Sequence, residues 1–301
     1  MIRTIALFIF ACAIFFSAWQ CSQADQLAEL SAKQLSVNGI TIRYWEQGKG
    51  VPVVFVHGAI SDHRYWEPQR EAVAKHYRFI ALDRRYFGTA PWPDSGEQFS
   101  QATQVADLAA FIGELKIGPV FLVGTSGGAV ISLVMAVQHP ELVRGIFVNE
   151  PGLASSLTDP ADQKLVSEFR AERQAATRAA AKAGNMEEAA RLFVDAANGK
   201  PGSFDTLSPE FKAMFVDNAR TVLLDAPPPV PITCAELGRV KLPVTITKGQ
   251  LTKPNSKIMA EAAHRCSRRS QLITIPAASH GASRQNPSAF NEALLQFLAR
   301  N

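Results

Sequence analysis

One short stretch, residues 120–130, restricts the possible folds of this chain more than any other part of the sequence. It reads Val-Phe-Leu-Val-Gly-Thr-Ser-Gly-Gly-Ala-Val, an apolar run with the length and branching of a buried strand that leads into Gly-x-Ser-x-Gly. The apolar spacing that follows predicts a helix. A strand can enter a helix through so tight a turn only if the residues around the central Ser have no bulky side chains. The glycines at 124, 127 and 128 meet this condition and therefore predict a nucleophile elbow.

The elbow would present a reactive hydroxyl beside hydrogen-bond donors. We expect the Oγ atom of Ser126 at the carboxyl edge of a sheet, with the backbone N–H of Gly127 directed at the same point. The apolar strand predicted at 52–56 ends in His-Gly-Ala, which would direct the N–H of Ala59 across the pocket. Together these N–H groups form a predicted oxyanion hole. The competing interpretation is a glycine-rich strand–helix connection without chemistry.

Four charged or titratable residues are expected to be architectural. We expect the ring of His57 to hydrogen-bond to nearby backbone and not to act as the base, because a better base follows later in the chain. Asp83 and Arg85 are expected to hold their loop together by an ion pair and backbone hydrogen bonds. Asp107 is expected to turn away from the core or to cap a loop.

Short apolar strands alternate with helical patterns along most of the chain. This alternation predicts an α/β fold with a mostly parallel, doubly wound sheet, whose sites lie at the carboxyl ends of the strands. Before it, a short helical segment is expected at 25–36 and a hairpin with an Asn-Gly turn at 37–45. The expected strands are 52–56, 79–82, 120–123, 144–148, 242–248 and 271–276, and the expected helices are 101–115, 129–137, 256–266 and 287–298.

The pattern changes between residues 153 and 231, where Ala- and charge-rich helical runs carry no strand signal. We expect a helical cap, 153–231, inserted into a core domain formed by 25–152 and 232–301. A cap excludes water and shapes a small-substrate pocket. Its large apolar residues are expected mainly to pack the cap, although some could line the pocket: Phe204, Phe211, Met214 and Phe215.

The amino terminus is predicted to be a secretory signal peptide, residues 1–24, and the protein to be exported to the periplasm or secreted. Arg3 precedes a mostly apolar run that is shorter than the roughly 20 residues needed to span a bilayer, and small residues follow at the cleavage positions. We expect no stable membrane insertion after signal removal. An uncleaved anchor and lipidation at Cys21 are the alternatives.

Signal removal would leave two cysteines, Cys234 and Cys266, in an oxidising compartment. We predict a disulfide between them, with two buried, unpaired thiols as the alternative.

The amino-acid composition indicates which classes of partner the protein is expected to bind. The chain has 301 residues, 47% of them hydrophobic and 19% charged, and its net charge of +4 comes from scattered basic residues. This distribution favours neither nucleic acid nor a membrane surface as the main partner. The sequence contains neither a metal-ligand cluster nor a phosphate loop, so we expect no metal and no cofactor, and a small-molecule substrate.

Four groups of residues together resemble the α/β-hydrolase superfamily with a helical cap, over residues 35–300. They are His57-Gly58, the loop 83–88, the elbow 124–128 and Ser279-His280-Gly281. Many members place an acid at the position of Thr252, which is not a carboxylate here. Some relatives place it after the preceding strand, where this chain has Glu150. The resemblance therefore implies a triad of Ser126, Glu150 and His280, with Asp225 as the rival acid.

A Ser nucleophile makes acyl-enzymes, with His280 as base and Glu150 holding its tautomer. The resemblance thus implies a serine hydrolase of esters, lactones or thioesters of small carboxylic acids. Perhydrolase activity and carbon–carbon hydrolysis of diketones stay open on the same scaffold. A ligand-binding protein with slow or no turnover is the hypothesis from another class.

Overall fold

A computed structural model of the chain describes residues 31–225 and 231–301. Its centre is an eight-stranded sheet in the order β1-β2-β4-β3-β5-β6-β7-β8, in which β2 pairs antiparallel with β1 and β4, and the other neighbours are parallel. The predicted α/β class with a mostly parallel sheet is confirmed. The strands are β1 (Lys33–Val37), β2 (Ile40–Gln47), β3 (Pro52–Val56), β4 (Arg78–Leu82), β5 (Val120–Thr125), β6 (Val143–Asn149), β7 (Val244–Gly249) and β8 (Ser270–Ile275).

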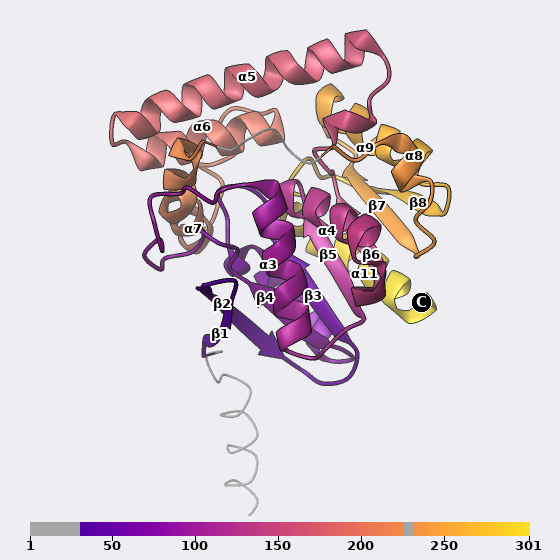
Figure 1. Cartoon of the computed structure of the whole chain (residues 1–301). Helices are drawn as coiled ribbons and strands as arrows, with labels where there is room; N and C mark the ends of the chain where they lie inside the picture. Colours follow the sequence, from indigo (N-terminus) through magenta and orange to yellow (C-terminus); the bar gives the residue numbers. More distant parts are fainter. Residues whose placement is uncertain (1–30, 226–230) are drawn as a thin grey trace, which may run out of the picture. The chain divides into compact units, whose positions relative to one another are not determined.

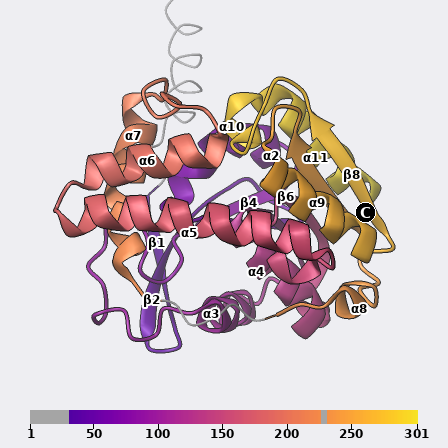
Figure 2. The same cartoon turned by 90° about the horizontal axis from the view of Figure 1, so that it is seen from above.

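Both faces of the sheet are covered, which explains why its central strands are apolar at every position. In β3, Val54 and Val56 pack on one face, whereas Val53 and Phe55 pack on the other. Helices α3 (Gln101–Glu114), α4 (Gly127–Gln138) and α9 (Pro254–Cys266) cover the first face, and α2 (Glu67–Ala74) and α11 (Pro287–Arg300) the second (Figure 2). No helix among residues 31–225 and 231–301 combines the length and apolar character needed to cross a bilayer.

The long connection from β6 to β7 contains, before the undescribed residues 226–230, the helices α5 (Pro160–Lys182), α6 (Met186–Asn198) and α7 (Pro209–Ala219). Figure 1 shows α5 and α6 crossing above the sheet. The two ends of the segment meet, because the Ser155 hydroxyl donates to the Ile232 carbonyl at 2.9 Å. We propose that these helices form the cap. The proline-rich end of this segment, 226–231, falls mostly on residues 226–230, which lie outside the described residues.

Polar contacts join the proposed cap helices to the core, and those of Asn218 are buried. Asn218 of α7 donates to Asp62 at 2.7 Å and accepts from the backbone N–H of Gly88 at 2.7 Å. Asp217 pairs with Arg64 at 2.8 Å. Phe204, Met214 and Phe215 are buried in the apolar cluster that also contains the α2 and α11 side chains, so packing is the main role of these three residues.

The amino-terminal expectations have mixed outcomes. The hairpin is confirmed, with Val37 opposite Ile40 and positive φ angles at Asn38 (45°) and Gly39 (76°), as a tight two-residue turn requires. A helix over 25–36 is wrong for its last four residues, because pairing with β2 makes 33–36 part of a strand. The first half of that segment, 25–30, and the predicted signal peptide, 1–24, lie outside the described residues.

The expected ion pair between Asp83 and Arg85 is wrong. Asp83 accepts from the backbone N–H of His63 at 3.0 Å and from its Nδ1 at 2.7 Å. Arg85 instead reaches α3, where two of its nitrogens lie 2.7 and 2.9 Å from the buried carboxylate of Asp107. A buried carboxylate is costly without a partner, and Arg85 supplies a cationic partner to Asp107. The Asp107 carboxylate also accepts a hydrogen bond from the Asn38 amide in the hairpin turn. Of the two expectations for Asp107, the one in which it caps a loop is therefore confirmed.

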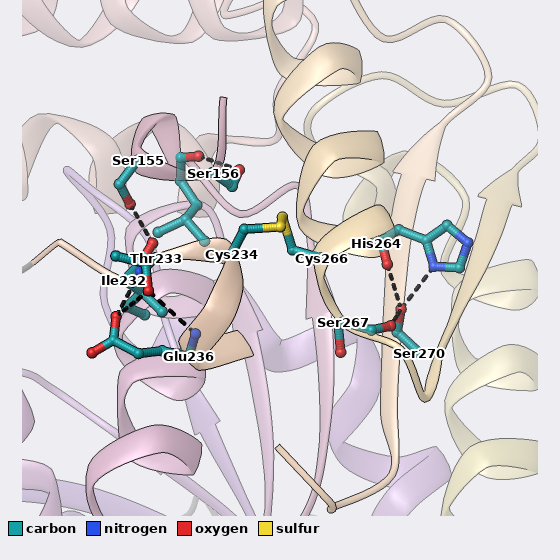
Figure 3. The surroundings of a disulfide bond; sticks show 11 residues. Ser155, Ser156, Ile232, Thr233, Cys234, Glu236, His264, Cys266, Ser267 and Ser270 are labelled. Carbon is teal, nitrogen blue, oxygen red and sulfur yellow. Dashed lines mark hydrogen bonds between the residues drawn. A yellow bond between two sulfur atoms is a disulfide. The ribbon is translucent and has the colours of Figure 1, made fainter. Parts of the chain in front are cut away.

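The predicted disulfide is confirmed. Figure 3 shows Cys234, the first residue of α8 (Cys234–Leu237), bonded to Cys266, the last residue of α9, with their Cα atoms 4.7 Å apart. A bridge over 32 residues restricts the unfolded chain, which raises the free energy of unfolding.

Replacing both cysteines with alanine (C234A/C266A) should lower the free energy of unfolding by about 3–4 kcal/mol, the loop-entropy value for a bridge of this length. Denaturation in guanidinium chloride without reductant measures the loss. Reductant added to the wild type should give a similar loss. An unchanged unfolding midpoint in both cases would show that the bridge does not form.

The β5–α4 junction has the backbone expected of the elbow. Ser126 adopts φ 52° and ψ −114°, a strained conformation for a non-glycine residue. A Cβ atom on Gly128 would lie 2.2 Å from the Val56 carbonyl, and one on Gly124 would lie 2.6 Å from the Gly128 carbonyl. A Cβ on Gly127 would meet nothing within 4 Å, so the steric need expected at 127 is wrong: that position faces open space.

Gly128→Ala should therefore lower the free energy of unfolding by about 2–3 kcal/mol, because α4 or β3 must shift. Gly127→Ala is the matched control and should stay within about 0.5 kcal/mol of wild type. Chemical denaturation compares the two. Equal stability of the two variants would contradict the packing described at the elbow.

Candidate active site

Ser126 lies at the junction of two cavities. The larger, about 330 Å³, extends between α5 and α9, and the smaller, about 40 Å³, extends toward Tyr65 and Phe215. Both are lined by Ala59, Ser126, Phe193, Ala197 and His280. A substrate at Ser126 would thus have room for a large group on one side and a very small one on the other.

Glu150 and His280 contact each other, as the sequence predicts. Glu150 follows β6 with φ 43°, and its Oε2 lies 2.7 Å from Nδ1 of His280. The carboxylate is fully buried, which alone would raise its pKa. Hydrogen bonds and charge from His280, with donors at Gly249 and Thr252, outweigh burial and hold the pKa of Glu150 below its ordinary value. Glu150 is therefore ionised at neutral pH and can orient the imidazole.

Thr252 stands at the position where the superfamily resemblance most often implies an acid, and its hydroxyl donates to Oε1 of Glu150. The backbone N–H of Gly249, at the end of β7, donates to the same oxygen at 3.0 Å. The β7 end therefore supplies donors to a carboxylate from β6. The sequence analysis missed this role of Thr252 as a donor to Glu150. The signal for it was the hydroxyl residue at a position where the superfamily usually has an acid.

The loop that carries His280 is held from two sides. The Asn149 amide donates to the His280 carbonyl at 2.9 Å. Asn198, the last residue of α6, has its Oδ1 3.0 Å from the Ser279 hydroxyl and 3.3 Å from the Gly281 N–H. The proposed cap thus helps to fix the residues on both sides of His280. No sequence pattern points to Asn198.

Ser126 and His280 line both cavities, but among the described residues the Ser126 hydroxyl makes no hydrogen bond. The backbone N–H groups of Ala59 and Gly127 likewise donate to no protein group in the described ranges, and both residues line the large cavity. Hydrogen bonds among catalytic groups commonly shorten when substrate binds. The roles of Ser126, Gly127 and Ala59 therefore stay predictions.

His57 has the architectural contacts expected of it. Its Nδ1 lies 2.9 Å from the Gly58 carbonyl, and its Nε2 accepts from the N–H of Arg84 at 3.1 Å. This pattern assigns the proton to Nδ1. Complete burial, followed by the charge of Arg84, holds the pKa of His57 well below its ordinary value. A neutral ring with both nitrogens engaged is not available as a general base.

The rival acid Asp225 lies elsewhere. Its side chain is 90% exposed and pairs with Arg178 of α5 at 2.7 Å. It is absent from the residues that line the two cavities at Ser126. The Nδ1 atom of His280 already faces Glu150, so Asp225 has no access to the position of the triad acid.

The structure brings Asp62, His63 and Asp83 together, with ligand-type atoms within 4.8 Å of one another. The sequence showed no such cluster, because the residues come from two loops. Asp62 already accepts from Arg64 and Asn218, and Asp83 from His63. We interpret the group as an ion-pair network that supports the core and the cap.

Three cationic residues in the large cavity were also missed: Arg170 and Arg173 on α5, and Lys253 before α9. On a charge-rich helix such residues are expected to face water. Their position follows only from the way α5 packs.

Comparisons with known proteins agree with this architecture. A model of the alpha/beta hydrolase family matches residues 53–293. The carboxylesterase CesB from Bacillus subtilis superposes with a TM-score of 0.73 over 96% of this chain and 98% of that one, at 19% identity.

Two curated relatives match more locally. A 2-hydroxy-6-oxo-6-(2'-aminophenyl)hexa-2,4-dienoic acid hydrolase from Metapseudomonas resinovorans is 32% identical over 42% of this chain and 46% of its own. An (E)-2-((N-methylformamido)methylene)succinate hydrolase from Acinetobacter baylyi is 36% identical over 38% of this chain and 43% of its own. The chain thus matches less than half the length of these relatives. Because the family model covers most of the chain and the sheet has the corresponding topology, this protein belongs to the alpha/beta hydrolase family.

Proposed function

We propose that this protein is a serine hydrolase that cleaves small carboxylic esters, lactones or thioesters through an acyl-enzyme on Ser126. The observation that carries the proposal is the 2.7 Å contact between Glu150 and His280, beside a strained Ser126 at the junction of two cavities. A buried, ionised carboxylate behind an imidazole is the arrangement that makes a serine hydroxyl nucleophilic.

The chemical steps follow from this arrangement. With Nδ1–H held by Glu150, the unprotonated Nε2 of His280 takes the Ser126 proton while Oγ attacks the carbonyl carbon. The N–H groups of Ala59 and Gly127 stabilise the resulting oxyanion, helped by the amino end of α4. His280 then gives the proton to the departing alcohol, and water repeats the cycle on the acyl-enzyme. The small cavity suits a short acyl or alcohol group.

One relative supports a second candidate. The substrate named for the Metapseudomonas resinovorans relative has a ketone and no ester, so its hydrolysis requires cleavage of a carbon–carbon bond. This favours hydrolysis of a diketone as the alternative reaction at the same serine. The resemblance to CesB, at 19% identity, concerns the fold alone.

We also propose that the protein is exported. The disulfide supports this, because such bonds persist in oxidising compartments.

A fluorophosphonate probe should label the protein promptly, and Ser126→Ala should abolish labelling, because the probe reacts only with an activated serine. Ser132→Ala is the control, since the buried Ser132 hydroxyl donates to the Gly128 carbonyl within α4. Intact-protein mass spectrometry measures the adduct. No labelling of the wild type would support the ligand-binding alternative.

Glu150→Gln should lower kcat for an acetate ester by roughly 10³- to 10⁴-fold, because the amide cannot stabilise the imidazolium and favours the wrong tautomer. The matched control is Asp225→Asn, the same change at the exposed rival acid, which should leave kcat unchanged. Steady-state kinetics and circular dichroism check rate and fold. A large loss in Asp225→Asn with little loss in Glu150→Gln would reassign the triad acid.

A further inference from the structure

The lining of the large cavity has an unbalanced charge. It contains the cationic side chains of Arg170, Arg173 and Lys253, and its one carboxylate, Glu150, already faces His280. We propose that the substrate of this site carries a carboxylate group besides the bond that is cleaved, and that Arg173 and Lys253 bind this carboxylate in the large cavity. The inference rests on the proposed hydrolase function and names the substrate class.

Arg173 is a partly buried cation whose surroundings are aromatic. Its guanidinium carbon lies 4.8 Å from the ring centroid of Phe193 and 5.7 Å from that of Phe169, and its Nε is buried without a hydrogen-bond partner in the described part of the chain. Burial, with a smaller effect of Arg170, lowers the pKa of Arg173 to about 10. A desolvated guanidinium that lacks an anion is costly, so the position is arranged to receive one.

Lys253 approaches the same place from the opposite element. Its Nζ lies 3.3 Å from the ring centroid of Phe169 and donates to the Ala196 carbonyl at the end of α6. Burial, followed by the charge of Arg173, lowers the pKa of Lys253 to about 7, although Glu150 acts in the other direction. Two like charges thus share one aromatic ring, and neither forms an ion pair within residues 31–225 and 231–301.

An added carboxylate would resolve this repulsion. Its two oxygens can accept from a guanidinium and an ammonium at once. Other cations in the described chain are satisfied in two ways: Arg85 pairs with Asp107 at 2.7 Å, whereas the buried Arg84 donates to the Gly58 carbonyl at 2.7 Å. Arg173 differs from Arg84 because its side chain donates no hydrogen bond within the described residues, and because it lines, with Lys253, the cavity at Ser126. The small cavity is also lined by a cation, Arg284, but its volume of about 40 Å³ is too small for a charged chain, so we assign the anionic end to the large cavity.

Two isosteric ester pairs test the proposal by pH-stat kinetics. On the acyl side, monomethyl glutarate is compared with methyl glutaramate; on the alcohol side, 4-acetoxybutanoate with 4-acetoxybutanamide. At least one carboxylate ester should have a kcat/KM about 10- to 100-fold above its amide partner, as expected of a charge-assisted hydrogen bond. Arg173→Met and Lys253→Met should each reduce this ratio by about tenfold or more.

The control variant is Lys164→Met, which removes a 75% exposed cation from the same helix, α5, and should leave both rates unchanged. Circular dichroism verifies the fold of each variant. If Arg173→Met fails to fold, Lys253→Met still decides the matter, because it lies on a different element. Equal kcat/KM values within both ester pairs would overturn the proposal.

A binding measurement separates this inference from the proposed catalysis. Ser126→Ala protein is titrated calorimetrically with glutarate, glutaramide and inorganic phosphate. If only glutarate binds, and if this binding is lost when Arg173→Met is added, the result supports the carboxylate subsite. This holds even if the wild type does not react with the fluorophosphonate probe. Prompt labelling of wild type without glutarate binding would leave the hydrolase standing and overturn the subsite. Tighter binding of phosphate than glutarate would overturn the assignment of the anion as a carboxylate.

Discussion

The hydrogen bond between Glu150 and His280 is the contact on which the organisation of the site depends. It joins residues that follow β6 and β8, two strands separated by β7, and β7 contributes donors at Gly249 and Thr252 to the same carboxylate. The sheet order therefore decides which side chains can meet. Parallel strands bring these carboxyl ends to one edge, and the burial of Glu150 makes the contact strong, because few waters compete for it.

Buried charge is distributed in two different ways in this protein. In the core and at its junction with the cap, Arg85 pairs with Asp107 and Arg64 with Asp62, and the buried Arg84 donates to the Gly58 carbonyl. In the large cavity, Arg173 and Lys253 pack against Phe169 without an acid. Compensated charges stabilise a fold, whereas an uncompensated pair leaves binding energy for an anion. The contrast distinguishes a structural network from a binding surface.

Much of the fold could be predicted from sequence because the signals are local. Apolar runs of four to seven residues marked the central strands, and Asn38 with Gly39 marked the hairpin turn. Wrong expectations arose where tertiary contacts decided: 33–36 became a strand by pairing with β2, Arg85 reached Asp107 instead of Asp83, and Gly127 proved sterically free. Each outcome depends on how neighbouring elements pair and pack, which the local pattern of the segment itself does not encode.

The sequence by itself determined the elbow around Ser126, the class of the sheet and the residues proposed as the triad, because close backbone packing and strand burial restrict which residue types can occur there. Only the tertiary structure decided how the site is completed: the donor from Thr252, the contacts of Asn198 with the His280 loop, and the cations that line the large cavity. These depend on how α5, α6 and the end of β7 pack together. A side chain's distance to residues 80 or more positions away follows from that packing and from no short pattern.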